Sequence, residues 1–130
     1  MVTTTKKIEY FQTNPFQKDL KRLLKKYRTL EEDLEMAKRA AIELFHLKNL
    51  DNNSVFLITA LPKSDIKIFK IKKFACRALK GSGAKSGIRV IYAYDASEDK
   101  VVFIEIYHKS EKENEDQCRI KEYAKSEDIK

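Results

Sequence analysis

Residues 66–74 read IKIFKIKKF, residues 88–94 read IRVIYAY and residues 101–107 read VVFIEIY. Side chains alternate between the two faces of a β-strand, so this two-residue period, rich in β-branched and aromatic residues, predicts three strands. Residues 95–100 form a polar connection of hairpin length, which makes the second and third strands antiparallel neighbours. Residues 7–12 and 55–61 are weaker strand candidates, because short apolar runs fit a strand or a helix equally well.

Two helices are predicted before this sheet. Asn14 and Pro15 suit the N-cap and the first helical position, and apolar residues then recur at helical spacing: Phe16, Leu20, Leu23, Leu24 and Tyr27. Thr29 and Glu32 have the spacing of a capping box, and an apolar stripe from Leu30 to Phe45 predicts a second helix that ends near Leu50. Because the turn between the two helices is short, we expect them to form an antiparallel hairpin.

A short helix is predicted after the sheet. Ser110 and Glu113 repeat the capping-box spacing, and four apolar positions suit a docked helix: Cys118, Ile120, Tyr123 and Ala124. The tail 125–130 is expected to fray. At 130 residues and 42% hydrophobic, the chain is long enough for one core and too short for two ordinary ones. The prediction is therefore an α+β fold in a single domain, residues 1–130, with the N-terminal helical hairpin packed on a small twisted antiparallel sheet.

The composition favours a polyanionic partner. The chain carries a formal net charge of +7 and has a pI of about 9.3, which attracts molecules such as RNA. No apolar run approaches the ~20 residues needed to cross a bilayer, and residues 1–10 lack the apolar core of a secretory signal. We therefore expect a cytoplasmic protein with no membrane partner. Cys76 and Cys118 stand far apart without a zinc-binding pattern, so no metal or other cofactor is expected.

Positive charge is concentrated between Lys63 and Arg89, where nine Lys and Arg residues occur with a single acid, Asp65. Enrichment in one sign of charge is typical of a surface that binds a phosphate backbone. A solvated basic loop is the simpler alternative.

Residues 75–87 form a basic loop between two of the predicted strands. Its sequence KGSGAKS, at 80–86, does not fit a nucleotide-binding P-loop, because Leu79 and Ala84 stand where glycines belong and a strand follows. We therefore interpret the loop as a flexible basic segment able to close over RNA, and we exclude nucleotide hydrolysis.

Strand alternation places part of this charge on one face of the sheet. If Phe69 and Ile71 face the helices, the other face carries Ile68, Lys70, Lys72 and Phe74, with the two ammonium groups about 7 Å apart. In the next strand the apolar face is made by Ile88, Val90, Tyr92 and Tyr94, so Arg89 joins the lysines. In the last strand Val102, Ile104 and Ile106 are expected to face the helices and Phe103, Glu105 and Tyr107 to face away. One sheet face is thus predicted to hold Lys70, Lys72, Arg89, Glu105 and Tyr107, with His108 at its rim.

This set meets the needs of metal-free ribonuclease chemistry. A base must take the proton of a ribose 2′-hydroxyl, cations must hold the phosphate and its developing charge, and an acid must protonate the leaving 5′-oxygen. Lys and Arg can hold the phosphate, and a histidine, which titrates near neutrality, can move a proton. For His108, isolated at a strand end, a structural role and a functional role are equally open.

Three stretches of the predicted sheet, 69–73 (FKIKK), 86–94 (SGIRVIYAY) and 99–109 (DKVVFIEIYHK), resemble the sheet of RelE/ParE toxins from type II toxin–antitoxin modules. In that superfamily a KIK strand is followed by a G-x-R-x-x-Y strand and by an apolar strand with a basic or His-containing end. Two N-terminal helices before a twisted antiparallel sheet are also the order of that family. The resemblance implies metal-independent cleavage of mRNA in the ribosomal A site, by 2′-hydroxyl attack that leaves a cyclic phosphate.

The resemblance also implies roles for individual residues. The candidate catalytic residues are Lys70 and Lys72, which match the KIK lysines, Arg89, which matches the arginine of G-x-R, and His108 at the end of the last strand. The candidate RNA-binding residues are Lys73, Arg77, Lys80, Lys85, Tyr107, Lys109 and Lys112. Ser110 stands where RelE-type members often have a catalytic arginine, and Asp116 stands near the place of a C-terminal tyrosine.

Three functions are weighed on this basis. The first is an mRNA endoribonuclease that acts on the ribosome, inhibits translation and is neutralised by a cognate antitoxin protein. The second is a ParE-like toxin that inhibits DNA gyrase, and the third is a non-catalytic RNA- or ribosome-binding module. Assembly into a homo-oligomer stays open. The acidic segment 111–116 is expected to be too short to mask the basic face.

Overall fold

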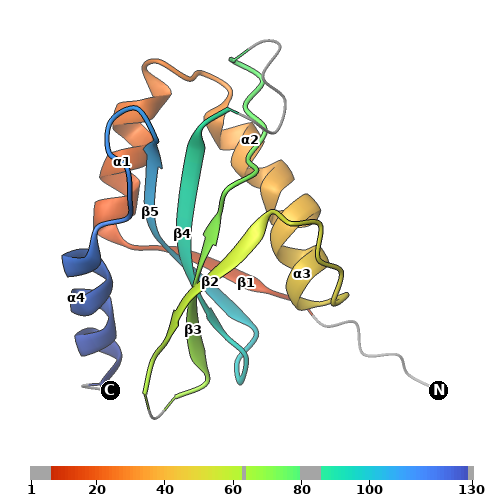
Figure 1. The fold of residues 1–130 in the computed structure, drawn as a ribbon, viewed down its shortest axis with the longest axis vertical. Helices are drawn as coiled ribbons and strands as arrows, with labels where there is room; N and C mark the ends of the chain where they lie inside the picture. The colour runs from red at the N-terminus through yellow and green to blue at the C-terminus, as the bar shows by residue number, and fades with distance from the viewer. Residues whose placement is uncertain (1–6, 63, 80–85, 129–130) are drawn as a thin grey trace.

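The computed structural model describes residues 7–62, 64–79 and 86–128 (Figure 1). The two segments that the sequence left open, 7–12 and 55–61, contain strands. The element bounds in chain order are β1 (Glu9–Gln12), α1 (Asn14–Leu24), α2 (Leu30–Ala37), η1 (Lys38–Glu43), α3 (Leu44–His46), β2 (Val55–Ala60), β3 (Ile66–Ile71), β4 (Ile88–Asp95), β5 (Lys100–His108) and α4 (Gln117–Asp128).

Within the described residues, five strands form one sheet in the order β1-β5-β4-β3-β2. The strands β2, β3, β4 and β5 pair antiparallel, and β4 and β5 form the predicted hairpin. The α+β prediction is confirmed, with the correction that β1 pairs with β5 in parallel and makes the sheet mixed. Alternation along a strand tells which side chains share a face but does not identify the neighbouring strand, so the sequence could not place β1.

The predicted start of α1 is corrected by one residue. The N-cap is Thr13, whose hydroxyl accepts a hydrogen bond from the Phe16 amide at 3.3 Å. Asn14 and Pro15 therefore lie in the first turn of the helix, where a proline needs no amide hydrogen.

The second predicted helix comprises α2, the π-helical segment η1 and α3, and it ends at His46 rather than near Leu50. Its predicted capping box does not form, because the Thr29 side chain makes no capping hydrogen bond. The Thr29 hydroxyl instead donates to the buried Asp33 carboxylate at 2.6 Å and accepts from the Ala78 amide at 2.9 Å. This side chain therefore joins the helix to the chain that follows β3.

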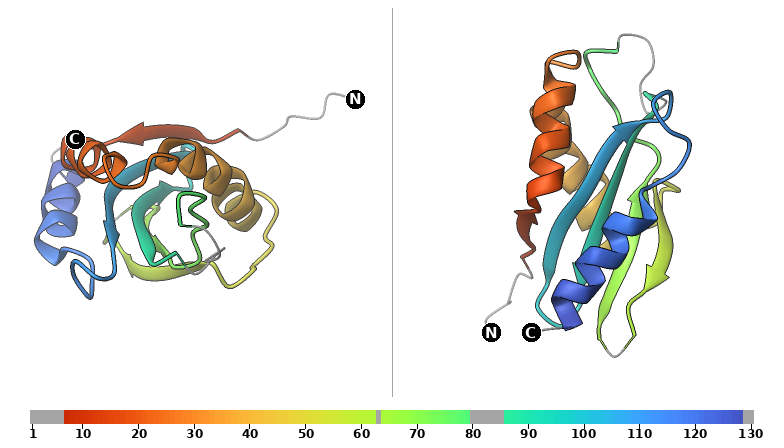
Figure 2. Two further views of the ribbon diagram at one scale, coloured as in Figure 1. Left: turned by 90° about the horizontal axis from the view of Figure 1, so that it is seen from above. Right: turned by 90° about the vertical axis from the view of Figure 1, so that its left-hand side faces the viewer.

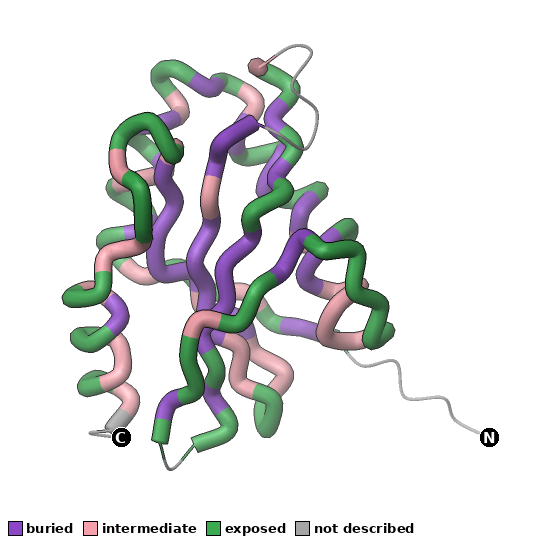
Figure 3. The backbone as a smooth tube through the Cα atoms, viewed as in Figure 1, coloured by how far each residue is buried: buried purple, intermediate pink, exposed green. Residues whose placement is uncertain are grey.

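Helices flank the curved sheet (Figure 2). The sheet carries a hydrophobic cluster on each face. On one face, α1, α2 and η1 cover the larger cluster, which includes Phe16, Leu30, Tyr92 and Phe103. On the opposite face, Ile120 of α4 packs on a smaller cluster. Figure 3 shows that β4 and β5 are buried along much of their length, whereas β2, at the edge, is largely exposed. The second face is thus covered only in part.

A β-bulge in β5 changes which residues face the helices. The register with β4 skips Ile104, which is the extra residue of the bulge. Phe103 therefore packs in the helix-side cluster, while Val102 and Ile104 pack on the other face. The orientations predicted for these three residues are wrong, because one extra residue reverses the alternation. Beyond the bulge, Glu105 and Tyr107 have the predicted orientation.

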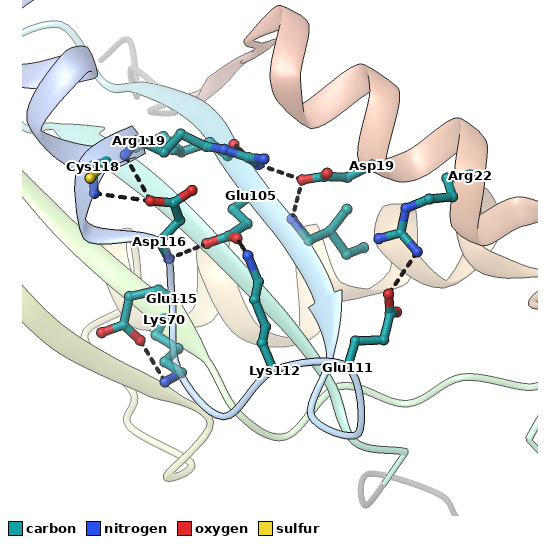
Figure 4. A network of polar contacts seen from close by, with 12 residues as sticks. Asp19, Arg22, Lys70, Glu105, Glu111, Lys112, Glu115, Asp116, Cys118 and Arg119 are labelled. Carbon is teal, nitrogen blue, oxygen red and sulfur yellow. Dashed lines mark hydrogen bonds and ion pairs between the residues drawn. The ribbon is translucent and has the colours of Figure 1, made fainter.

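Side chains from both flanking helices bind the backbone at this bulge (Figure 4). Asp19 of α1 accepts a hydrogen bond from the Ile106 amide at 3.3 Å. Arg119 of α4 donates to Asp19 at 2.5 Å and to the Ile104 carbonyl at 3.2 Å. Asp19 and Arg119 therefore connect α1 and α4 to β5 at the bulge.

The C-terminal helix α4 begins later than predicted. The capping box expected at Ser110 does not form, because the Ser110 hydroxyl is bonded to the ring of His108. The Asp116 carboxylate instead accepts from the amides of Cys118 and Arg119 at 3.0 and 3.2 Å and caps the helix. The helix extends to Asp128 and so includes the first residues of the predicted tail.

Candidate nucleic-acid interface

Strand pairing brings the predicted charged side chains onto the sheet face that points away from α1–α3, here called the site face. Lys70 lies opposite Ile91, which lies opposite Glu105, and together they form one row across β3, β4 and β5. Arg89 and Tyr107 form the next row. This grouping agrees with the alternation in the sequence.

One residue predicted on this face lies elsewhere. Phe74 packs in the helix-side cluster. Because β3 ends at Ile71, the alternation of the strand does not continue as far as Phe74. The basic row on β3 therefore ends with Lys72 and Lys73, which follow the strand and are exposed.

The open part of the site face is a pocket of about 310 Å³, here called the basic pocket. It is lined by Asn53, Phe56, Lys72, Lys73, Gly87, Arg89 and Lys109. Four of these described lining residues are cationic and none is acidic. Arg89 is half-buried, and its guanidinium donates to the Lys72 carbonyl oxygen at 2.8 Å, which fixes its position.

The other part of the site face is closed by the segment 111–116, here called the acidic strap (Figure 4). The Lys70 ammonium donates to the Glu115 carboxylate at 2.7 Å, with the two side chains only 10% and 12% exposed. The buried Glu105 carboxylate pairs with the Lys112 ammonium and accepts from the Asp116 amide at 2.9 Å. The expectation that this segment is too short to mask the basic face is therefore wrong for Lys70.

Burial and charge act in opposite directions on the Lys70–Glu115 pair. Burial is the largest single effect on Lys70 and would lower its pKa, but Glu115 and Tyr107 together outweigh it and raise that pKa above 10.5. Burial alone would raise the pKa of Glu115, but the Lys70 ammonium lowers it below 4.5. Both groups are therefore charged at neutral pH, and the strap is held by a true ion pair.

Tyr107 lies beneath the strap between two cations. Its hydroxyl is buried and has no hydrogen-bond partner in good geometry among the described residues. Burial raises the pKa of Tyr107, against the opposing effect of Lys70, and the Lys112 ammonium lies 5.1 Å from the ring centroid. The phenol is thus neutral and shielded while the strap is closed.

His108 points to the helix side and not to the rim of the site face. Its ring stacks on Tyr27, with centroids 5.8 Å apart. Nε2 lies 3.0 Å from the Ser86 carbonyl oxygen, and Nδ1 accepts from the Ser110 amide at 3.0 Å. These contacts fit a neutral ring protonated at Nε2. Of the two roles left open by the sequence, they favour the structural one.

Gly87 allows His108 to pack closely. Its φ is +85°, in the left-handed region that favours glycine, and an added Cβ would lie 2.8 Å from His108 Nε2. The Lys109 amide donates to the Gly87 carbonyl at 2.9 Å. The glycine of the G-x-R motif is therefore required by the junction of β4 and β5, next to Arg89.

The remaining candidate RNA-binding residues are divided among three environments. Lys73 and Lys109 line the basic pocket, whereas Tyr107 and Lys112 belong to the closed part. Arg77 is paired with Glu32 and Asp33 at α2, away from the site face. Lys80 and Lys85, in the basic loop, lie outside the described residues, as does Lys63.

Phe56 and Asn53 line the pocket but were not predicted as site residues. The available signal was weak, because residues 55–61 fit a strand or a helix. Once β2 is paired with β3, Phe56 lies opposite Lys70 and its place on the site face follows.

The described residues contain no helix long and apolar enough to span a membrane. Among the same residues, no three His, Cys, Asp or Glu side chains come together as metal ligands would. Cys76 is buried and Cys118 is exposed, and neither forms a disulfide.

Among solved structures, the chain is similar to a chain of the archaeal RelE–RelB complex from Pyrococcus horikoshii. The TM-score is 0.49 and the sequence identity is 11%, covering 81% of this chain and 98% of that chain. No protein-family model matches the sequence, and no curated protein matches it. The function of the site face is therefore inferred from its own side chains.

Proposed function

We propose that the chain is the toxin of a toxin–antitoxin module and cleaves mRNA on the ribosome. The motifs at 69–73, 86–94 and 99–109 support this assignment through their resemblance to RelE/ParE toxins. The observation that carries it is the basic pocket, where four cationic side chains converge and the described lining residues include no carboxylate. Such a pocket suits a phosphodiester backbone, which carries one negative charge per phosphate.

Arg89 is proposed to hold the reacting phosphate. One of its N–H groups is bound to the Lys72 carbonyl, and the others are left to form a fork on phosphate oxygens. Lys72 supplies a second cation from the same pocket. Donors fixed before the reaction stabilise the charge that develops on the phosphate without further reorganisation.

The proposed reaction is attack of a ribose 2′-oxygen on the adjacent phosphorus. The 2′-hydroxyl gives its proton to a base, the new P–O bond closes a 2′,3′-cyclic phosphate, and the P–O bond to the 5′-oxygen breaks. The 5′-oxygen takes a proton from an acid and leaves as a hydroxyl. Lys70 is the proposed acid and must first leave Glu115. His108 is the proposed base, a role that requires its ring to leave Tyr27, Ser86 and Ser110 and to turn from the helix side to the site face.

A non-catalytic RNA- or ribosome-binding module is the second candidate, and one observation favours it. Lys70 is engaged by the strap and both ring nitrogens of His108 are engaged by neighbouring groups, while the basic pocket stays open. Binding needs only the open pocket. Catalysis needs the engaged groups as well.

The proposal includes a cognate antitoxin as partner. An amphipathic segment with acidic residues would pair with Lys72, Lys73 and Lys109 and cover the exposed apolar side chains of β2. The acidic strap already pairs with Lys70 in this way, which supports an acidic partner on this face.

The test is a translation reaction on a defined mRNA with purified protein. Primer extension should reveal new 5′ ends in the translated region, and those ends should carry a 5′-hydroxyl opposite a 2′,3′-cyclic phosphate. A 2′-deoxy nucleotide at the mapped position should abolish the cut. Translation that stops with intact mRNA would support the non-catalytic module. Collapse of DNA supercoiling with normal translation would support gyrase inhibition and overturn the proposal.

A further inference from the structure

The basic pocket has an aromatic wall, formed by Phe56. Phe56 is 39% exposed, although the preceding Val55 is buried in the helix-side core. Alternation along the edge strand β2 turns Phe56 towards the site face, where it lies opposite Lys70. An exposed aromatic side chain thus borders a strongly cationic pocket.

The face of this ring is accessible from the pocket. The Lys72 ammonium lies over it, 4.7 Å from the ring centroid. A cation–π contact at an exposed site is weak, and lysine is flexible. A flat group with a larger contact area can therefore take the place of the ammonium, and Lys72 is then free to bind a nearby anion.

The other walls of the pocket suit a phosphate. Lys73 and Lys109 provide mobile cations, and Arg89 provides a fixed one. The pocket volume of about 310 Å³ lies at the lower end of the range for small-ligand sites, roughly 300–1,000 Å³. The combination of aromatic wall, cationic walls and small volume fits one nucleotide rather than a run of stacked ones.

We propose that the basic pocket binds one unpaired nucleotide of single-stranded RNA, with its base stacked on Phe56 and its phosphate on Arg89. This inference rests on the proposed function for the identity of the ligand as RNA. It adds that recognition requires an unstacked base and that β2 supplies the stacking platform.

A duplex is excluded by the same geometry. In a duplex each base is stacked on its neighbours and its flat face is hidden, so only the backbone could reach the cations. Aromatic stacking is tolerant of base identity, because every base has a flat face. The pocket should therefore select single strands over duplexes and discriminate weakly between bases.

The test uses a short RNA with 2′-O-methyl groups, which block cleavage, and with the fluorescent base 2-aminopurine at one position. The wild-type protein at low salt should bind it and quench the fluorescence, because a stacked 2-aminopurine is quenched. Phe56→Leu should bind about 5- to 150-fold more weakly, the range for losing one base–aromatic stack, and should not quench. Phe56→Tyr should behave as wild type.

Leu57→Ala is the matched control. Leu57 is the next residue on β2, is 57% exposed, and points to the opposite face, so its loss should change neither affinity nor quenching. Thermal unfolding of all variants shows that each is folded. Three outcomes would each overturn the proposal. Phe56→Leu could bind and quench as the wild type does, the wild type could bind a duplex of the same sequence equally well, or the wild type could fail to bind the RNA.

The outcomes separate this inference from the proposed function. Quenching that depends on Phe56 without any cleavage on the ribosome would support the nucleotide pocket and overturn the ribonuclease. Cleavage on the ribosome that is unaffected by Phe56→Leu, together with unchanged binding, would support the ribonuclease and overturn the pocket.

Discussion

Replacing Glu115 with glutamine should open the acidic strap while leaving the sheet folded. The Lys70–Glu115 pair is nearly buried and is the ion pair that joins the strap to β3. Glutamine has the same shape and keeps an oxygen acceptor, but it lacks the charge that balances the Lys70 ammonium.

The size of the effect follows from the kind of bond. A hydrogen bond to a charged group contributes about 1.5–3 kcal/mol. Since glutamine keeps one acceptor, we expect a loss near the lower end, about 1.5 kcal/mol. That loss makes the open form of the strap roughly tenfold more populated.

The effect should depend on pH. The pKa of Glu115 is lowered in the folded state, so its contribution to strap closure is complete above pH 4.5. That contribution is lost as the pH falls through the pKa of the folded state. The pKa of Lys70 is raised, so its contribution to strap closure is complete below pH 10.5. That contribution is lost as the pH rises through the pKa of the folded state. Glu115→Gln should therefore match wild-type strap closure only in strong acid or strong base.

Amide hydrogen exchange measures the opening directly. The Asp116 amide, bonded to Glu105, should exchange roughly tenfold faster in Glu115→Gln at neutral pH, while the amides of β4 keep their wild-type protection. Glu113→Gln is the control, because Glu113 is exposed and forms no ion pair with the described residues. Unchanged exchange in Glu115→Gln, or the same acceleration in Glu113→Gln, would show that the Lys70–Glu115 pair does not hold the strap closed.

Three further predictions concern the pocket and the core. Arg89→Ala should slow single-turnover cleavage of ribosome-bound mRNA by about 100-fold or more. Arg39 is an exposed residue of η1, so Arg39→Ala should cleave at the wild-type rate. An equal loss of RNA binding and of cleavage in Arg89→Ala would argue against a role of Arg89 in chemistry. Gly87→Ala should lower the free energy of unfolding in urea by more than about 1 kcal/mol, because of its φ of +85° and the 2.8 Å approach to His108, and wild-type stability would contradict this. Burial lowers the pKa of His46 from 6.5 to about 4, so between these pH values the unfolded chain binds a proton that the folded chain does not. The free energy of unfolding should therefore fall as pH falls from 6.5 to 4. His46→Gln should reduce this dependence on pH, and an unchanged dependence would show that His46 does not cause it.

The alternation of apolar and polar residues was enough to predict the central strands and most of the charged face. The two-residue period at 66–71 and 88–94 placed Lys70 and Arg89 on the same side of the sheet, and strand pairing agrees with this. This works because side-chain direction in a regular strand depends only on the parity of the position. The same logic placed Glu105 and Tyr107 correctly.

Local patterns failed where a residue had a competing partner in the tertiary structure. Thr29 and Ser110 each stand three residues before a glutamate, as in a capping box. In the structure, however, the Thr29 hydroxyl binds Asp33 and the Ser110 hydroxyl binds His108. A hydroxyl forms the bond that the folded chain brings within reach, and short-range spacing is only one source of such bonds.

Which charges are free and which are paired could not be predicted from the sequence, because this depends on contacts between distant segments. The bulge at Ile104, which reverses the alternation in β5, is stabilised by Asp19 and Arg119 from two different helices, and no local sequence feature announces it. The ion pair of Lys70 with Glu115 joins residues that are 45 positions apart. Lysines can be counted from the sequence, but the sequence does not show whether an ammonium group faces solvent or a carboxylate. Electrostatic interactions depend on distance in space and not on separation along the chain.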